Sequence, residues 1–237
     1  MTNATEEKNT AREKALIESG AHFGYTRPRR HPSIKPYLAG SKNRVDIIEV
    51  DKIAETLEKA KEFVAELGKS GKIMLFVGSK PEARETVMNA ALGLDMPYVT
   101  ERWLGGTLTN FSEIKKRIDR LNDLIEKRTK GETKVYTKKE QLLIDREIAR
   151  LEKYFRGLSQ MKNLPAAIFV ADSKKEEIAV EEAIKMKIPV VSISNSDCDI
   201  SRVSYPIVGN DASVSSIIFF VSEIVSAYQS GREVSDK

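Results

Sequence analysis

The chain of 237 residues has one cysteine, Cys198, and only two histidines, His22 and His31. A single cysteine excludes an intrachain disulfide, which is typical of proteins from a reducing compartment. No apolar run approaches the roughly 18 residues of a membrane span. The polar N-terminal stretch contains Glu6 and Glu7 and lacks the apolar core of a secretory leader or the composition of a transit peptide. We therefore expect a cytoplasmic protein with no membrane partner.

The sequence also lacks the motifs of common α/β enzymes. None of the expected strands is followed by the dinucleotide-binding motif Gly-x-Gly-x-x-Gly. The string most similar to a phosphate-binding loop, at 68–72, has the wrong glycine spacing and stands before a strand instead of after one. There is no Gly-x-Ser-x-Gly elbow, and neither histidine lies at a strand end, where α/β sites form. We predict no catalytic residue and no cofactor. Three polar residues do stand at the ends of expected strands, namely Ser79, Asp172 and Asn195. A cleft that binds a small ligand there stays an alternative.

Aspartates near the cysteine are the candidates for a cation site. Asp197 and Asp199 flank Cys198 and could bind a cation together with Asp172. Aspartate in loops more often forms turns, because its side chain accepts hydrogen bonds from the following backbone. We predict no metal site and keep the cation as the alternative.

Positive charge is concentrated in two blocks. The net charge of the chain is only +4, yet positions 21–45 hold six basic and no acidic residues. Positions 112–163 hold fifteen basic and nine acidic residues, and the remainder has a net charge of −8. Two basic blocks in an otherwise acidic chain indicate a polyanionic partner. The mixed signs of the second block also suit a solvated surface that binds nothing.

The first block is rich in proline. Pro28, Pro32 and Pro36 are spaced by four residues, which predicts an extended, semi-rigid strip without helix over 27–44. A strip held extended loses little conformational entropy on binding. Its candidate contacts to the polyanion are the six basic residues Arg27, Arg29, Arg30, Lys35, Lys42 and Arg44.

Elsewhere, apolar runs alternate with helical patterns. A strand at 45–50 precedes a helix over 51–68, and the fully apolar run 73–77 leads through a turn into a helix ending near 92. Further strands are expected at 97–99, 166–171, 188–193 and 206–208, with helices over 174–187 and from a cap at Asn210 or Asp211 to 229. Short apolar strands separated by helices are typical of parallel sheets. We predict an α/β fold with a doubly wound, mostly parallel sheet, like that of flavodoxin or Rossmann proteins.

Residues 111–159 interrupt this alternation. Two apolar stripes repeat with alternating spacings of three and four, at Phe111, Ile114, Ile118, Leu121 and Ile125 and at Ile144, Ile148, Leu151, Phe155 and Leu158. Such stripes predict an inserted antiparallel coiled-coil hairpin that projects from the domain. Asn110 with Glu113 resembles a capping box for its first helix. Two ordinary surface helices, which would have wider apolar faces, are the alternative.

The string at 102–110 holds the only tryptophan. Arg102 places a guanidinium beside the aromatic face of Trp103. Gly105 and Gly106 allow a turn with positive φ. We expect Trp103, Gly105, Gly106 and Asn110 to form a structural turn that anchors the hairpin, with Arg102 partly exposed beside it.

These strings resemble the bacterial-type small-subunit ribosomal protein S2 (uS2) family. The resemblance extends from about Leu16 to Gly231 and rests on residues 20–24, 32–37, 72–80, 102–110, 164–165, 188–190 and 209–211. It implies a non-enzymatic structural constituent of the cytoplasmic ribosome, with a protruding coiled coil. The implied partners are small-subunit rRNA, neighbouring ribosomal proteins and the large mRNA-binding ribosomal protein S1. If the resemblance holds, the candidate rRNA-binding residues are Arg102 and the six basic residues of the strip.

The expected organisation has four parts. A flexible N-terminus with a short helix covers 1–20, and a discontinuous α/β domain covers 21–110 and 160–231 and includes the strip 27–44. The coiled-coil insertion covers 111–159, and a tail covers 232–237.

Three strings depart from the family pattern. Gly24-Tyr25 replaces the usual Gly-His, the loop 194–199 lacks the usual Asp-Thr-Asn-x-Asp-Pro, and Asp211-Ala212-Ser213 replaces Asp-Asp-Ala. These changes weaken the expectation of a metal site in those loops and of S1 recruitment.

Two other functions stay open. One is an α/β enzyme that binds a nucleotide or sugar phosphate, against which the absent phosphate loops count. The other is a coiled-coil adaptor with a vestigial α/β domain, whose binding would survive high salt, unlike the binding of RNA.

Overall fold

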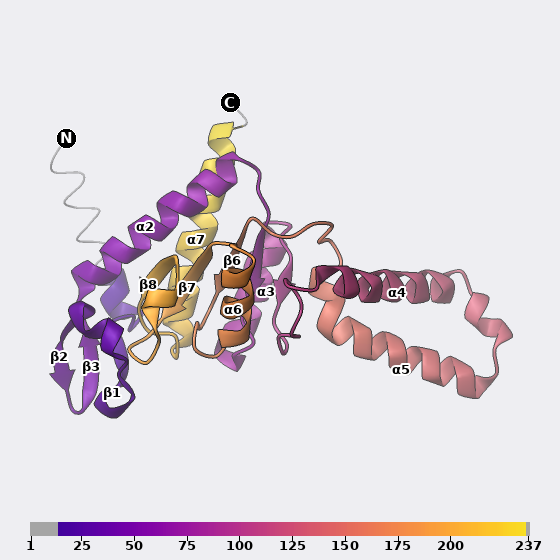
Figure 1. Cartoon of the computed structure of the whole chain (residues 1–237), viewed down its shortest axis with the longest axis horizontal. Helices are drawn as coiled ribbons and strands as arrows, with labels where there is room; N and C mark the ends of the chain where they lie inside the picture. Colours follow the sequence, from indigo (N-terminus) through magenta and orange to yellow (C-terminus); the bar gives the residue numbers. More distant parts are fainter. Residues whose placement is uncertain (1–13, 236–237) are drawn as a thin grey trace.

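A five-stranded parallel sheet forms the centre of the molecule. The computed structural model describes residues 14–235 (Figure 1). Its larger sheet has the strand order β5-β4-β6-β7-β8, and every neighbouring pair is parallel. The strands are β4 (Met74–Val77), β5 (Tyr98–Val99), β6 (Ala167–Val170), β7 (Val190–Ser194) and β8 (Tyr205–Val208). Each begins within two residues of its predicted position, so the predicted α/β class and parallel sheet are confirmed.

Helices cover both faces of this sheet. α2 (Val50–Lys69), α3 (Pro81–Gly93) and α7 (Val214–Ser235) lie on one face, and α6 (Glu177–Lys185) lies on the other (Figure 1). Successive residues of a strand point to opposite faces. Accordingly, Met74 and Phe76 pack with the first set of helices, whereas Leu75 and Val77 pack with α6. The sheet is therefore buried on both sides.

Two glycines allow α2 and α7 to pack closely. A Cβ on Gly68 would lie 2.3 Å from the carbonyl oxygen of Tyr228, and a Cβ on Gly231 would lie 2.1 Å from that of Ala65. No side chain fits at either position without a shift of backbone. The crossing of the two helices therefore requires glycine on each.

The N-terminal basic strip is extended only in part, and the expected absence of helix is wrong. Two 3₁₀ helices, Arg27–Arg29 and Pro32–Tyr37, occupy half of it, and residues 38–42 form a strand. Pro28 and Pro32 stand in the first turns of these helices, where the fixed φ of proline fits and its missing N–H is not needed. Two of the three prolines therefore mark helix starts, whereas Pro36 lies inside the second helix.

A second, antiparallel sheet surrounds this strip. It has the order β1-β3-β2, with β1 (Phe23–Thr26), β2 (Leu38–Lys42) and β3 (Val45–Ile48). Asn43 and Arg44 both have positive φ and close the two-residue turn between β2 and β3, as a tight hairpin requires. Of these strands, only the third was predicted from the sequence. The short helix predicted within 1–20 is present at 14–18, whereas residues 1–13 and the end of the tail lie outside the described residues.

Two long helices extend away from the sheet as an arm (Figure 1). α4 (Phe111–Thr129) and α5 (Lys138–Phe155) contact each other and are joined through a 3₁₀ turn at Glu132–Val135. Most of the predicted apolar stripe is buried, but Ile125 is 37 % exposed and Leu124 is buried in its place. The buried face of α4 therefore shifts by one residue near the tip of the arm.

The two predicted helix caps are wrong. Asn110 stands at the N-cap of α4, but its side chain makes no capping bond, and Glu113 pairs with Lys116 at 2.6 Å. The capping box is instead at α5, between Thr137 and Glu140. α7 begins only at Val214. The Asn210 side chain is bound to the backbone of Ala212 and Gly20, and the Asp211 carboxylate is bound to Lys80, so neither caps the helix. None of the described helices has an apolar stretch long enough to cross a membrane.

Candidate nucleic-acid interface

Five of the six predicted strip residues are free cations at the surface. Arg27, Arg29, Lys35, Lys42 and Arg44 are exposed, and within residues 14–235 none of them forms an ion pair. The backbone N–H of Arg27 donates to the carbonyl of Arg44 at 3.2 Å, which ties the two ends of the strip together. The Arg29 guanidinium lies 5.7 Å from the centre of the Tyr25 ring. The antiparallel sheet therefore presents several uncompensated positive charges.

Arg30, the sixth, faces inward. Its Nε donates to Asp46 Oδ2 at 2.7 Å, a second guanidinium nitrogen donates to Oδ1, and Ser41 Oγ donates to the same carboxylate at 2.6 Å. The Asp46 side chain is fully buried. The hydrogen bonds from Arg30 hold the pKa of Asp46 below its usual value. Arg30 thus ties the end of the first 3₁₀ helix to Ser41 and Asp46 on either side of the turn at 43–44.

Trp103 anchors the start of the arm through a residue that sequence reasoning missed. Trp103 is buried, and its Nε1 donates to Glu182 Oε1 at 3.1 Å. The same oxygen accepts from the N–H of Gly106 at 2.7 Å. The other oxygen accepts from the N–H groups of Leu108 and Thr109 and from the Thr109 hydroxyl, at 3.0 to 3.1 Å. One carboxylate therefore binds the whole loop 103–109.

The only sequence signal for Glu182 is its position. It lies on the same helix as the buried Ala179, Val180 and Ala183, so it is an acid on an otherwise apolar face. Burial alone would raise the pKa of Glu182, but hydrogen bonds from the backbone of Gly106, Leu108 and Thr109 outweigh burial and lower it. The carboxylate stays ionised without a cation.

The predicted glycine turn depends on one glycine. Gly106 has φ of +93°, where a β-branched side chain is strained, and its carbonyl accepts from the N–H of Asn110 at 2.8 Å. Gly105 has open space around its Cβ position. Arg102, which was expected to be partly exposed, is exposed.

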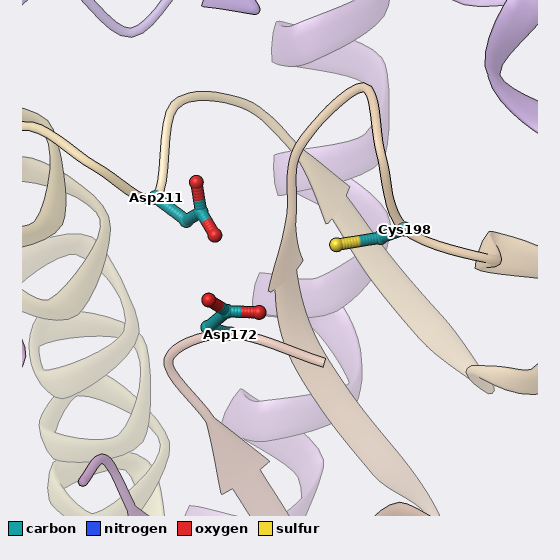
Figure 2. A group of neighbouring side chains, drawn as sticks. All are labelled: Asp172, Cys198 and Asp211. Carbon is teal, nitrogen blue, oxygen red and sulfur yellow. The ribbon is translucent and has the colours of Figure 1, made fainter. Parts of the chain in front are cut away.

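An ammonium group occupies the polar end of the sheet. Lys80 Nζ lies 3.2 Å from carboxylate oxygens of both Asp172 and Asp211 and 3.3 Å from the Tyr25 hydroxyl. Figure 2 shows Asp172, Asp211 and Cys198 around a common centre, with their ligand atoms within 4.8 Å of one another. Burial alone would lower the pKa of Lys80, but the charges of Asp211 and Asp172 raise it. Lys80 thus supplies the positive charge that a metal ion would bring.

The structure does not assemble the alternative cation site. Asp197 accepts from Lys174 Nζ at 2.9 Å, and Asp199 accepts from the Ser201 hydroxyl at 2.6 Å. Burial raises the pKa of the Cys198 thiol to about 12, which keeps it protonated and a poor ligand. Among the described residues, the carboxylate that lies within ligand distance of Asp172 and Cys198 is that of Asp211, and not those of Asp197 and Asp199.

In the turn after β4, the backbone N–H of Ser79 also has a hydrogen-bond partner within the protein. In doubly wound folds, the backbone N–H groups at this strand-to-helix turn bind the phosphate of a nucleotide. Here the N–H of Ser79 donates to Glu176 Oε1 at 2.8 Å, and Glu176 is buried. A carboxylate of the chain itself occupies the position that a phosphate would need, which argues against the nucleotide-binding enzyme.

Comparison with known proteins decides the family. The model of the family described as ribosomal protein S2 matches residues 16–231. The chain belongs to the ribosomal protein S2 family. A small ribosomal subunit protein uS2 of Coprothermobacter proteolyticus is 42% identical over 220 residues, which cover 93% of this chain and 82% of the relative.

Other members of the family are similar over nearly their whole length. The uS2 of a Roseiflexus species is 42% identical, covering 92% of this chain and 84% of the relative. That of Chloroflexus aurantiacus is 40% identical and covers both chains completely. The S2 family consists of ribosomal structural proteins and not of enzymes. The family resemblance inferred from the sequence strings is therefore confirmed over nearly the same span.

Proposed function

We propose that this chain is a structural constituent of the small ribosomal subunit in the cytoplasm, where it binds small-subunit rRNA and neighbouring ribosomal proteins. The observation that carries the proposal is the 40–42% identity to uS2 proteins over almost the entire chain. At the end of the sheet where such folds place a catalytic site, Lys80 is paired with Asp172 and Asp211.

The strip is the first rRNA contact. Arg27, Arg29, Lys35, Lys42 and Arg44 support this role because they are exposed and lack carboxylate partners within the described chain. Each lysine or arginine that contacts a phosphate releases a counterion and strengthens binding at low salt. Arg102 is a further candidate at the base of the arm, and Arg30 contributes by holding the strip in place.

The arm is an antiparallel coiled-coil insertion over 111–159 in the α/β domain 21–110 and 160–231. Its heptad spacing and its buried stripe favour this arrangement. Trp103, Gly106 and Asn110 join it to the domain, and Gly105 lies in the same turn at a position where a side chain would also fit. The tip exposes Val135, Tyr136, Leu142 and Leu143. Exposed apolar side chains at a projecting end suit contact with a neighbouring ribosomal protein.

Recruitment of ribosomal protein S1 is a separate proposal. It rests on the family resemblance alone, and the altered loop 194–199 is the place where this chain would differ from relatives. A pull-down with S1 from the same organism tests it.

Binding to purified small-subunit rRNA tests the strip. The double variant Arg29→Gln and Lys35→Gln should lower the slope of log affinity against log salt concentration by about two. The matched control is Lys69→Gln with Lys185→Gln, two exposed lysines elsewhere that make no ion pair in the described chain. Equal slopes for both variants would refute the strip as the contact.

A further inference from the structure

A cleft of about 510 Å³ lies where the arm joins the domain. It lies between the loop at Trp103, the end of α5, the turn after β4 and the start of α6. Four cations line it, namely Arg84, Arg102, Lys153 and Lys175. Its volume falls within the roughly 300–1,000 Å³ of typical ligand sites.

The cleft has more positive than negative charge available to a ligand. Arg84 pairs with Glu101 at 3.4 Å, and the other acid of the lining, Glu176, is bound to the Ser79 N–H. The remaining cations are Arg102, Lys153 and Lys175. All three are exposed, and no ion pair forms with any of them within residues 14–235. Three positive charges therefore face the cleft without compensation.

Another cleft of the molecule differs in this respect. In the cleft near His31, Lys174 pairs with Asp197 at 2.9 Å and Arg202 pairs with Glu177 at 3.1 Å. Its charges are therefore balanced within the protein.

The charge of the arm is also concentrated at its base. Residues 111–159 have a net charge of +5, of which the segments nearest the sheet, 111–118 and 148–159, hold +4. The distal part, 119–147, holds only +1. The positive field of the arm is thus directed at its junction with the domain, where the cleft lies.

We propose that this cleft is a second RNA-binding site, which takes the phosphate backbone of an rRNA strand between Arg102, Lys153 and Lys175. The inference rests on the proposed ribosomal function and extends it to a surface separate from the strip. The three cations come from three segments, the loop before the arm, α5 and the turn before α6. A strand bound among them joins the arm to the sheet domain and fixes the direction of the arm.

The geometry favours a polynucleotide strand over a free nucleotide. A mononucleotide site in this fold needs the N–H groups of the turn after the first strand, and Glu176 occupies that of Ser79. Lys80 is bound by Asp172 and Asp211. Trp103 is only 5 % exposed, so it packs and offers no stacking face. The groups that remain available to a ligand are the long side chains of Arg102, Lys153 and Lys175. Such side chains suit contact with the phosphate backbone of a strand that passes along the surface.

The test compares two triple variants in binding to purified small-subunit rRNA at about 50 to 200 mM salt. One carries Arg102→Gln, Lys153→Gln and Lys175→Gln. The control carries Lys69→Gln, Lys185→Gln and Lys187→Gln, which removes the same charge from exposed positions elsewhere. Circular dichroism and the emission of Trp103 establish that both are folded. If the cleft variant loses its fold, Lys175→Gln alone replaces it, with an expected slope change of about one.

The cleft variant should bind at least tenfold more weakly at low salt, with a salt slope lower by two to three, and the control should change by less than threefold. Equal behaviour of the two variants would overturn the proposal. Adenosine monophosphate should not compete with the RNA, and competition at micromolar concentration would assign the cleft to a free nucleotide instead. Wild-type chain that binds no rRNA would refute the proposed function itself, whereas wild-type binding with an unaffected cleft variant refutes only this site.

Discussion

Two buried carboxylates, Asp46 and Glu182, are stabilised by different kinds of partner. Asp46 is neutralised by the guanidinium of Arg30, and Glu182 is bound by backbone N–H groups and the Trp103 indole. Burying a charge is costly unless it is paired or fully hydrogen-bonded. Each carboxylate therefore fixes a loop that the proposed function needs, Asp46 the basic strip and Glu182 the base of the arm.

Neighbouring arginines of the strip should behave differently when replaced. Arg30→Ala leaves Asp46 buried without its cation and should lower the free energy of unfolding by about 3 kcal/mol. Arg29→Ala removes an exposed side chain and should leave stability unchanged while weakening rRNA binding. Denaturant unfolding and RNA binding on the same samples check both. A loss of stability in Arg29→Ala, or none in Arg30→Ala, would contradict these roles.

Glu182→Gln should lower the free energy of unfolding by about 2 kcal/mol, because the amide places N–H groups against N–H donors of the loop. The pKa of Glu182 is lower in the folded chain than in the unfolded chain. Its stabilisation is therefore complete above the usual pKa of a carboxyl group and is lost as the pH falls through the folded value.

Denaturant unfolding across the acid range measures the effect of this change. The variant should be less stable than wild type at pH 7, and the difference should shrink as the pH falls below about 4.5. A constant difference at every pH would show that packing, and not the ionised carboxylate, binds the loop.

At the scale of elements, the strands of the parallel sheet were easier to predict than those of the antiparallel sheet. Runs such as 73–77 are short, apolar throughout and bounded by turn residues, which is typical of a strand covered on both faces. The strip was misread because proline suits the first turn of a 3₁₀ helix as well as an extended chain. Glu182 could not be paired in advance, since its partners lie more than 70 residues away. The odd buried acid on α6 shows only that a partner exists.

The crossing of α2 and α7 depends on glycine. Gly231→Ala should lower the free energy of unfolding by about 1 to 3 kcal/mol, because the new Cβ would meet the backbone of α2 at Ala65. Gly93→Ala is the control, because open space surrounds that position near the end of α3. Equal stability of Gly231→Ala and wild type would show that the helices separate at no cost.

At the scale of the molecule, the strip and the arm lie on opposite sides of the five-stranded sheet (Figure 1). The sheet holds two basic surfaces apart, as expected for a protein that contacts separate segments of one large RNA. The buried stripe of the arm continues into the apolar cluster beneath α6 through Trp103 and Leu108. The base of the arm therefore belongs to the domain core, and only its distal part is free to be removed.

Truncating the distal arm should separate the roles of its two ends. Arg120 and Glu147 face each other at 3.3 Å, so a short glycine–serine linker can replace 119–147. The shortened chain should fold and keep its rRNA affinity within about threefold, because this part carries a net charge of only +1. It should be incorporated less well into small subunits because the apolar tip is gone.

Circular dichroism, rRNA binding and reconstitution with the truncated chain measure these three properties. Loss of the fold would place the distal helices in the core. Full incorporation would show that the tip contacts no neighbouring protein.

Sedimentation of the tagged, full-length chain from its own cells tests the ribosomal function most directly. On a sucrose gradient, the chain should migrate with the small subunit and with complete ribosomes, and high salt should release it because phosphate contacts weaken with ionic strength. A chain that remains among the soluble proteins at the top of the gradient, while other small-subunit proteins sediment, would contradict the account.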